Sequence, residues 1–197
     1  MTALLLLALF QVQHQSHPPR SAAEYAKVLE NPARDAWQKP HEVIQALALK
    51  PQEAVADIGA GSGYFARRIA HHAAKLYAVD IDPKLLEMIR GANIETVLAT
   101  HDDPKLPDAS VDTIFICDVL HHIASRPAYY AKLAKALKPG GRIVIIDFYK
   151  KQLPVGPPVS MKLSEDEVKA EFEAAGFHIA RSHDFLPHQY FLEFQRR

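Results

Sequence analysis

Residues 55–65 read Val55-Ala56-Asp57-Ile58-Gly59-Ala60-Gly61-Ser62-Gly63-Tyr64-Phe65, and this stretch decides the fold. An apolar strand runs into three alternating glycines and then straight into an amphipathic helix. Glycines let the backbone turn sharply and approach a ligand closely, and the helix that follows offers unpaired N–H groups. The stretch therefore predicts a site for a nucleotide-like ligand at the end of the first strand.

The spacing of the glycines narrows the kind of ligand. A dinucleotide-binding loop reads G-x-G-x-x-G, with its third glycine where a pyrophosphate meets the helix N-terminus. Counting from Gly59, that third place holds Tyr64. The spacing therefore disfavours a pyrophosphate and the nicotinamide cofactors that carry one.

The segment Asp57-Ile58-Gly59-Ala60-Gly61-Ser62-Gly63 resembles the first motif of class I methyltransferases that depend on S-adenosylmethionine (SAM). Further blocks follow where this family has them, and together they cover about residues 40–195. They read Tyr77-Ala78-Val79-Asp80, Asp102-Asp103-Pro104-Lys105-Leu106-Pro107, Asp112-Thr113-Ile114-Phe115-Ile116-Cys117-Asp118-Val119-Leu120-His121-His122 and Leu137-Lys138-Pro139-Gly140-Gly141-Arg142. The chain is similar to small-molecule methyltransferases of type 11, and the resemblance implies SAM as cofactor.

Downstream of residue 50, the hydrophobic pattern alternates between strands and helices. We expect strands over residues 54–58, 75–79, 95–99, 113–117 and 142–148, with helices over 64–73, 83–90 and 128–137. Apolar strands separated by helices of this length require a parallel sheet that is covered on both faces.

The C-terminal part has a different pattern. Ser164 caps a helix that ends near Ala175-Gly176, and two strands follow over residues 177–185 and 188–194. The join Leu186-Pro187 is so short that these strands must be antiparallel. The resemblance then implies an α/β fold with a doubly wound, Rossmann-like sheet of seven strands, mostly parallel with an antiparallel C-terminal hairpin, in the order 3-2-1-4-5-7-6.

The composition fits one globular domain. The chain has 197 residues, of which 48% are hydrophobic, and 23 basic residues balance 23 acidic ones. This size allows a sizeable core, and the balance gives no overall field that would attract nucleic acid. We expect one SAM-dependent methyltransferase domain over residues 21–197, with an N-terminal helical cap at 21–50 and a small-molecule substrate as partner. The sequence does not indicate the oligomeric state.

Residues 1–20 have another character. Ala3 to Phe10 are continuously apolar, and a polar linker with Pro18-Pro19 follows. This pattern predicts either an apolar tail or the remnant of a signal peptide. The apolar run is too short for a stable membrane span, which takes about 20 residues. Because the cofactor is made in the cytoplasm, a cytoplasmic protein is favoured, with export or membrane association as the alternative if these residues belong to a signal.

Neither cysteine nor histidine indicates a metal site. The single cysteine, Cys117, lies within an apolar strand pattern, which predicts a buried structural thiol. The pairs His71/His72 and His121/His122 are adjacent, so the two side chains of each pair point in different directions. Asp147-Phe148 stands where catechol-type enzymes carry an Asp-Asn pair for magnesium, so half of that ligand set is absent. No metal is expected.

SAM presents a sulfonium amino acid, a ribose and an adenine, and the resemblance implies residues for each part. Asp80 ends the second strand and matches the family's acid for the ribose hydroxyls, with a helix cap as its alternative role. Asp102 matches the acid that accepts from the adenine amino group, with the adjacent Asp103 as competitor. Ile81 is expected either against the adenine face or in the apolar core.

The first motif is expected at the amino-acid end of the cofactor. The resemblance gives Asp57 the loop N–H groups or the cofactor's ammonium as partners, and a purely structural role on buried backbone donors stays open. Gly59, Ala60 and Gly61 form the turn itself. Tyr64 opens the next helix, where it either leans on the methionine part or packs in the core.

The resemblance places Asp118 at the end of the fourth strand, facing the methyl donor, because ligands of open sheets collect at that edge. The residues after it lack the Pro-Pro-aromatic turn of enzymes that methylate exocyclic base amines. His121 is the candidate general base, with a structural histidine as the alternative. Trp37 and Tyr149 are the candidate walls of the acceptor pocket, and a core position is the alternative for Trp37.

These residues predict transfer of a methyl group from SAM to a small-molecule acceptor, with S-adenosylhomocysteine as the other product. Methyl transfer mainly needs alignment and exclusion of solvent, so no obligatory base must be visible in the sequence. Two alternatives are a SAM-binding protein without turnover and, less favoured by the glycine spacing, a NAD-dependent oxidoreductase.

Overall fold

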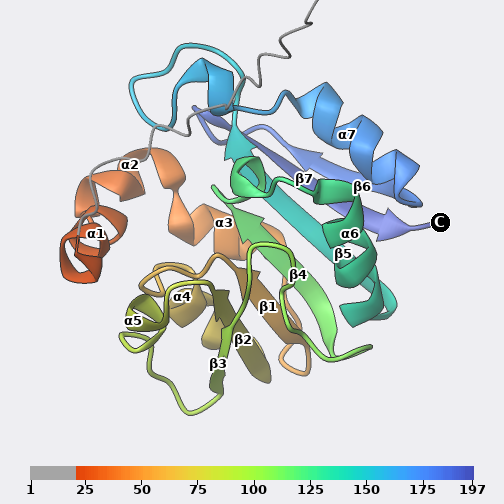
Figure 1. The fold of residues 1–197 in the computed structure, drawn as a ribbon, viewed down its shortest axis with the longest axis horizontal. Helices are drawn as coiled ribbons and strands as arrows, with labels where there is room; N and C mark the ends of the chain where they lie inside the picture. Colours follow the sequence, from red (N-terminus) through yellow and green to blue (C-terminus); the bar gives the residue numbers. More distant parts are fainter. Residues whose placement is uncertain (1–20) are drawn as a thin grey trace, which may run out of the picture.

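The computed structural model describes residues 21–197, and Figure 1 shows their arrangement. One sheet of seven strands runs through the molecule in the order β3-β2-β1-β4-β5-β7-β6. The strands are β1 (Ala54–Ile58), β2 (Lys75–Asp80), β3 (Ile94–Leu98), β4 (Val111–Cys117), β5 (Leu137–Phe148), β6 (Phe177–His183) and β7 (Gln189–Arg196). The predicted strand order and antiparallel hairpin are confirmed. The predicted tail and linker at 1–20 lie outside the described residues.

The first five strands are parallel, and β1 lies between β2 and β4. In the register of these pairs, Ile58 lies opposite Val79 on one side and opposite Ile116 on the other. Parallel strands place their C-terminal ends at one edge of the sheet. The loops after β1, β2 and β4 therefore meet at the edge where the sequence predicts the ligand.

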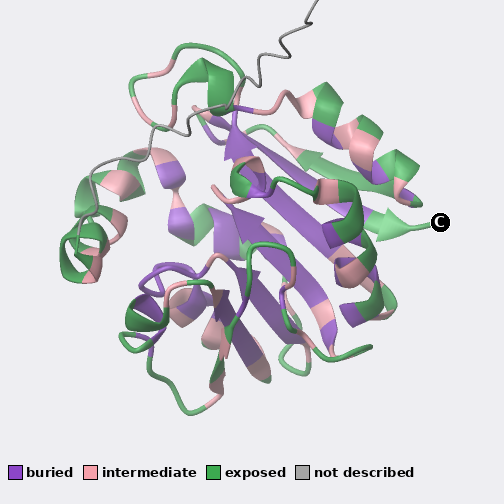
Figure 2. Ribbon diagram, viewed as in Figure 1, coloured by how far each residue is buried: buried purple, intermediate pink, exposed green. Residues whose placement is uncertain are grey.

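Helices cover both faces of the sheet (Figure 1). On one face α3 (Pro40–Leu47), α4 (Ala66–Ala70) and α5 (Pro83–Leu86) pack in an apolar cluster with alternate residues of β4 and β5. On the other face, α6 (Arg126–Ala136) and α7 (Glu165–Ala174) pack in a second apolar cluster. Its strand residues are those of β4 and β5 that alternate with the first set and point to this face. This division follows from the two-residue period of strands. Figure 2 shows the middle strands buried and the outer helix surfaces exposed.

Two helices are shorter than the periodicity predicts. In α5 the apolar pattern continues to Ile89, which is buried, although the helix ends at Leu86. The backbone there forms i→i+3 turns, with Met88 N–H donating to Leu85 and Ile89 N–H donating to Leu86. The helix α4 covers 66–70 instead of 64–73, because the glycine turn runs on before it.

The N-terminal segment consists of α1 (Ala22–Leu29), the 3₁₀ turn η1 (Pro32–Arg34) and α2 (Asp35–Gln38). We call residues 22–38 the cap, which is the first part of the helical cap expected over 21–50. It lies to the left in Figure 1, and α1 contacts α5. Short 3₁₀ turns also occur at η2 (Leu120–His122) and η3 (Val159–Met161). Within residues 21–197, none of the helices is both long and apolar enough to cross a bilayer.

Two capping boxes give a matched test of this fold. Ser164 begins α7, which buries Val168 and Phe172, whereas Ser21 begins α1, which has no buried residue. Replacing Ser164 by Ala should lower the free energy of unfolding by about 1 kcal/mol, because α7 must stay formed in the folded core. Ser21→Ala should change it by less than about half as much, because α1 can open locally. Denaturant titration measures both, and equal losses would contradict this difference.

Candidate functional site

The glycine loop after β1 has the backbone that the sequence predicts. Gly59, Gly61 and Gly63 have φ values of 75°, 55° and 98°, in the left-handed region that favours glycine. A Cβ on Gly59 would lie 2.2 Å from Cγ2 of Val119, so this turn has no room for a side chain. The loop therefore presents bare backbone at the C-terminal edge of the sheet.

Asp80 lies directly beside this loop. Its Oδ2 accepts a hydrogen bond from Gly61 N–H at 2.7 Å, and its Oδ1 accepts from Asp82 N–H at 3.0 Å. The capping role belongs to Asp82, whose Oδ1 accepts from Lys84 N–H at 2.8 Å. Asp80 is thus not the helix cap. The neighbouring Ile81 is 47% exposed, so its side chain is on the surface of this edge and not in the core.

Asp57 is a buried acid with an unfilled acceptor. Its side chain belongs to β1, the residue is 3% exposed, and Oδ2 has no hydrogen-bond partner among the described residues. Burial raises its pKa to about 7, Asp80 adds to the rise, and Arg34 and the backbone N–H of Ala66 oppose it. An unpaired buried carboxylate oxygen is costly, so this position suits a ligand that brings a positive charge or a donor.

Asp118 follows β4 with a φ of 61°, a backbone conformation that residues with side chains seldom adopt. Its Oδ2 accepts from Nη2 of Arg34 at 3.1 Å, and its Oδ1 accepts from Nε2 of Gln189. Burial raises its pKa to about 7, Arg34 opposes the rise, and Asp147 adds to it. Asp118 is therefore held in a fixed orientation at the edge of the sheet.

Arg34, Gln38, Gln189 and Asp118 form a closed ring of hydrogen bonds. Arg34 Nε donates to Gln38 Oε1 at 3.0 Å, and Gln38 Nε2 donates to Gln189 Oε1 at 2.8 Å. Gln189 and Arg34 both donate to Asp118, which closes the ring. Both glutamines are fully buried. The ring joins the cap to β7 and to the end of β4, and sequence reasoning missed three of its members because no local motif marks them.

Tyr64 combines a core position with contacts to the cap. It is 4% exposed, and its hydroxyl donates to Asp35 Oδ1. The guanidinium carbons of Arg34 and Arg68 each lie 4.2 Å from its ring centroid. Cations at this distance are attracted by the negative face of an aromatic ring. Tyr64 therefore links the first turn after the glycine loop to residues 34 and 35 of the cap.

The cap also covers the glycine loop itself. A Cβ on Gly61 would lie 2.7 Å from Cδ1 of Leu29. Ser62 Oγ donates to Glu30 Oε1 at 2.6 Å, and Arg67 Nη2 donates to the same oxygen at 2.7 Å. Residues 29–38 thus form one wall of the predicted cofactor site.

His121 pairs with Asp147, near the end of β5. Its Nδ1 lies 2.8 and 3.0 Å from the two carboxylate oxygens, and the two side chains are 3% and 1% exposed. The sequence analysis discussed Asp147 only as part of an incomplete set of magnesium ligands. A histidine and a carboxylate on different elements give no spacing signal, so only the fold reveals this pair.

The two predicted wall residues pack against different aromatic rings. The ring of Trp37 is 5.6 Å from that of Phe148, and Tyr149 follows Phe148 in the chain with its ring 6.0 Å from that of Tyr190. Trp37 and Tyr149 are both half-buried. The cap and the end of β5 thus bring aromatic side chains together at the same edge as Asp118.

Asp102 and Asp103 lie in the turn after β3. Asp103 accepts from Lys105 N–H at 2.8 Å with one oxygen and from Lys132 Nζ at 3.2 Å with the other. Asp102 is exposed, and its Oδ1 accepts from Thr100 Oγ1 at 2.7 Å. Because both oxygens of Asp103 are engaged, Asp102 is the better placed of the two to accept from a ligand. Its role on adenine stays a prediction.

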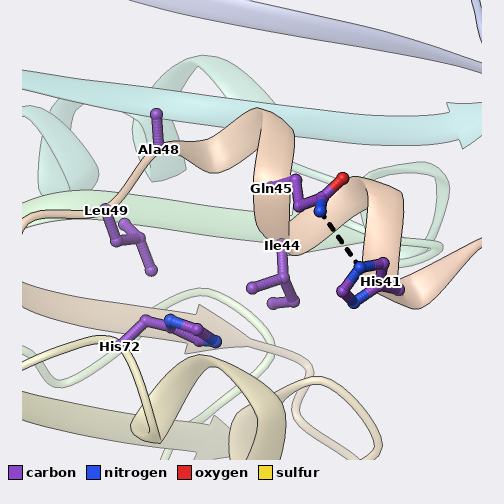
Figure 3. A pocket seen from close by; sticks show the side chains of 6 residues that line it. All are labelled: His41, Ile44, Gln45, Ala48, Leu49 and His72. Carbon is purple, nitrogen blue, oxygen red and sulfur yellow. Dashed lines mark hydrogen bonds between the residues drawn. The ribbon is translucent and has the colours of Figure 1, made fainter.

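A surface pocket of about 270 Å³ lies elsewhere, between α3 and the turn after α4 (Figure 3). It is lined by His41, Ile44, Gln45, Ala48, Leu49 and His72. None of the predicted site residues lines it, so we place the candidate site at the glycine loop, where buried acids and bare backbone converge. In the part of the chain that the structure describes, His, Cys, Asp and Glu form no group of three or more that could hold a metal ion.

Comparison with known proteins matches residues 56–145 to a family described as a methyltransferase domain. The demethylmenaquinone methyltransferase of Tropheryma whipplei (strain Twist) is 33% identical over 116 residues, which cover 56% of this chain and 48% of that protein. Phosphoethanolamine N-methyltransferase 1 of Arabidopsis thaliana is 32% identical over 114 residues, 54% of this chain and 23% of that protein. The chain spans about half the length, or less, of these curated relatives.

A solved structure, that of a SAM-dependent methyltransferase from Aquifex aeolicus, has a TM-score of 0.81 at 24% identity, covering 89% of this chain and 98% of that chain. This likeness shows the fold. The family match runs from β1 into β5, so it includes the glycine loop, Asp80 and Asp118. Residues 56–145 thus match a methyltransferase domain, and the chain has the fold of a SAM-dependent methyltransferase.

Proposed function

We propose that this protein binds SAM and transfers its methyl group to a small-molecule acceptor. The observation that carries the proposal is the 2.7 Å hydrogen bond between Gly61 N–H and Asp80 Oδ2. It brings a loop without side chains and the acid of the next strand to one place. Such a pair suits a nucleoside, because the backbone can approach the sugar while the carboxylate accepts from its hydroxyls.

The residues present fit the cofactor. The buried, unpaired Oδ2 of Asp57 suits the positively charged amino-acid end of SAM. Asp80 would hold the ribose and Asp102 the adenine amino group, with the exposed Ile81 beside the adenine. The methionine part would be lined by Gly59, Ala60, Gly61 and Tyr64, with Asp118 toward the methyl group.

When bound, SAM supplies a methyl group on a sulfonium, from which a thioether leaves readily. The task of the protein is to align the acceptor and to exclude water, and alignment alone can contribute about 7–11 kcal/mol. The cap residues 29–38 cover the glycine loop, and Trp37 packs near Phe148. These contacts support a site from which bulk water is excluded.

The acceptor is a small molecule with an apolar body. The half-buried rings of Trp37, near Phe148, and of Tyr149, near Tyr190, support this, because aromatic rings contribute a large apolar contact area. One curated relative is named for demethylmenaquinone, which agrees with an aromatic acceptor. The cytoplasm, where SAM is made, is the expected place of action.

The proposal is tested by incubating the full chain with SAM that carries a labelled methyl group and with a panel of quinols, phenols and amines. Mass spectrometry should detect S-adenosylhomocysteine and a labelled product in equal amounts. Binding of SAM without any turnover across the panel would favour the non-catalytic alternative. No binding of SAM by calorimetry would overturn the proposal.

Asp80 and Asp82 provide a matched pair of variants. Asp80→Asn should weaken SAM binding by about 10- to 100-fold, because a neutral amide replaces a carboxylate that accepts two charge-assisted hydrogen bonds. Asp82→Asn should leave the dissociation constant within about three-fold, because Asp82 caps α5 and Asn also caps helices. Isothermal titration calorimetry measures both, and similar losses would argue against the ribose role of Asp80.

Asp57 should make SAM binding depend on pH. Because its pKa is about 7 in the free protein and a cationic ligand favours the carboxylate, the SAM dissociation constant should fall several-fold from about pH 6 to about pH 8. Asp57→Asn should weaken binding and flatten this dependence. A wild-type constant that stays flat over this range would contradict the assignment.

As the pH rises, SAM binding should become stronger, but the free energy of unfolding of the ligand-free protein should fall. The folded pKa of Asp57 lies above its unfolded value, so the folded state binds more protons, and stability falls as pH rises from about 4 to about 7. Asp57→Asn removes this loss. The difference in unfolding free energy between variant and wild type should widen over that range and stay constant above it.

A further inference from the structure

The carboxylate of Asp147 is held in place by several donors. Its Oδ1 accepts from Phe148 N–H at 2.8 Å, and its Oδ2 accepts from His121 N–H at 3.3 Å. Both oxygens also lie within hydrogen-bond distance of His121 Nδ1. An ionised carboxylate only accepts hydrogen bonds, so Nδ1 must carry the ring proton. The other ring nitrogen, Nε2, then has a free lone pair when the ring is neutral.

Within residues 21–197, the Nε2 atom of His121 is unpaired, although the side chain is only 3% exposed. Among the described residues it has no hydrogen-bond partner, and it is not one of the fully buried, unpartnered nitrogens. The pair lies at the predicted methyl-donor edge, since η2 begins two residues after Asp118 and Asp118 interacts electrostatically with both His121 and Asp147. His121 is therefore close to Asp118, which the sequence predicts to face the methyl donor.

A second polar group on this face has no partner. Tyr190 lies opposite Asp147 in the β5–β7 pair, so the two side chains share a face of the sheet. The Tyr190 hydroxyl is buried without a hydrogen bond to any described residue. Buried hydroxyl groups in native structures are nearly always satisfied, so this one points to a polar ligand atom or a water on the same face as the pair.

If the His121–Asp147 pair only joined η2 to β5, the Nε2 atom of His121 would not need to stay unpaired. The other charged groups around the pair are Asp118 with its partner Arg34, His122 with its ring 4.2 Å from that of His121, and Lys162, which interacts with Asp147. His122 is exposed, and its ring makes no hydrogen bond to a carboxylate within residues 21–197. His122 is therefore the natural control residue.

We propose that His121 is the general base of the methyl transfer, that Asp147 is its positioning residue, and that the acceptor is a nucleophile that still carries its proton at neutral pH, such as a phenolic or quinol hydroxyl. This rests on the proposed function. Nε2 takes the proton of the hydroxyl while the oxygen lone pair forms the new bond to the methyl carbon. The electron pair of the broken carbon–sulfur bond stays on sulfur. The imidazolium, stabilised by Asp147, then releases its proton to water.

The first test uses His121→Asn, Asp147→Asn and the control His122→Asn with a phenolic acceptor of pKa about 10, for which a positioned base contributes about 10²–10⁴-fold. His121→Asn should lower kcat by that order, whereas His122→Asn should keep it within about three-fold. Asp147→Asn should lower kcat by about 10-fold or more and change the pH profile, because its amide can stabilise the wrong tautomer. All three should bind SAM as the wild type does.

The second test replaces the acceptor by a phenol of pKa below about 6, which is already ionised at neutral pH and needs no base. The loss in His121→Asn should then shrink to less than about three-fold. An equal loss of kcat with both phenols would overturn the proposal, because it would mean that His121 acts in alignment or folding and not as a base. Full activity of His121→Asn with the less acidic phenol would overturn it as well.

A third measurement does not depend on turnover. Nitrogen-15 NMR of the wild-type protein should show the neutral ring of His121 protonated on Nδ1, and Asp147→Asn should increase the other tautomer. A ring protonated on Nε2 in the wild type would overturn the proposal. If instead the wild type fails to bind SAM, the proposed function fails, and the tautomer still reports on the pair independently.

Discussion

The parallel pairing of β1 with β2 on one side and with β4 on the other is the constraint on which the site depends. With Ile58 opposite both Val79 and Ile116, the glycine loop is level with Asp80 and close to the end of β4. A shift by one residue in either pair would turn these side chains to the opposite face. The hydrogen bond from Gly61 to Asp80 is a direct result of this register.

Burial of negative charge at this edge is the second constraint. Asp57 and Asp118 both have pKa values raised to about 7, chiefly by burial, and Arg34 opposes the rise in each case. A protein without need for a ligand here would gain stability from neutral side chains. Arg34 belongs to the cap, so the cap provides part of the counter-charge of the site as well as its wall. Docking of the cap and the electrostatics of the acids are therefore linked.

Sequence reasoning predicted the parts of the site that lie in local patterns. The three glycines follow a strand whose apolar run is plain, Asp57 and Asp80 lie near the ends of such strands, and the helix cap at Ser164 is read from the few residues around it. It did not find Gln38, Gln189 or the pairing of Asp147, because a polar residue at such a position is equally consistent with an exposed surface. It left the role of Asp80 open between ribose binding and helix capping, and the hydrogen bond from Lys84 N–H to Asp82 shows that Asp82 is the cap.

The sequence by itself determined the element types, the parallel sheet with its antiparallel end, and the methyltransferase-like glycine loop, since these depend on periodicity and on glycine positions that act within a few residues. The tertiary structure decided which distant side chains share one buried volume: Arg34 with Asp118, Gln38 with Gln189, and His121 with Asp147. The physical reason is that hydrogen bonds between buried side chains depend on distances of a few ångströms in space. Residues 26 to 151 positions apart in the chain leave no pattern from which such distances follow.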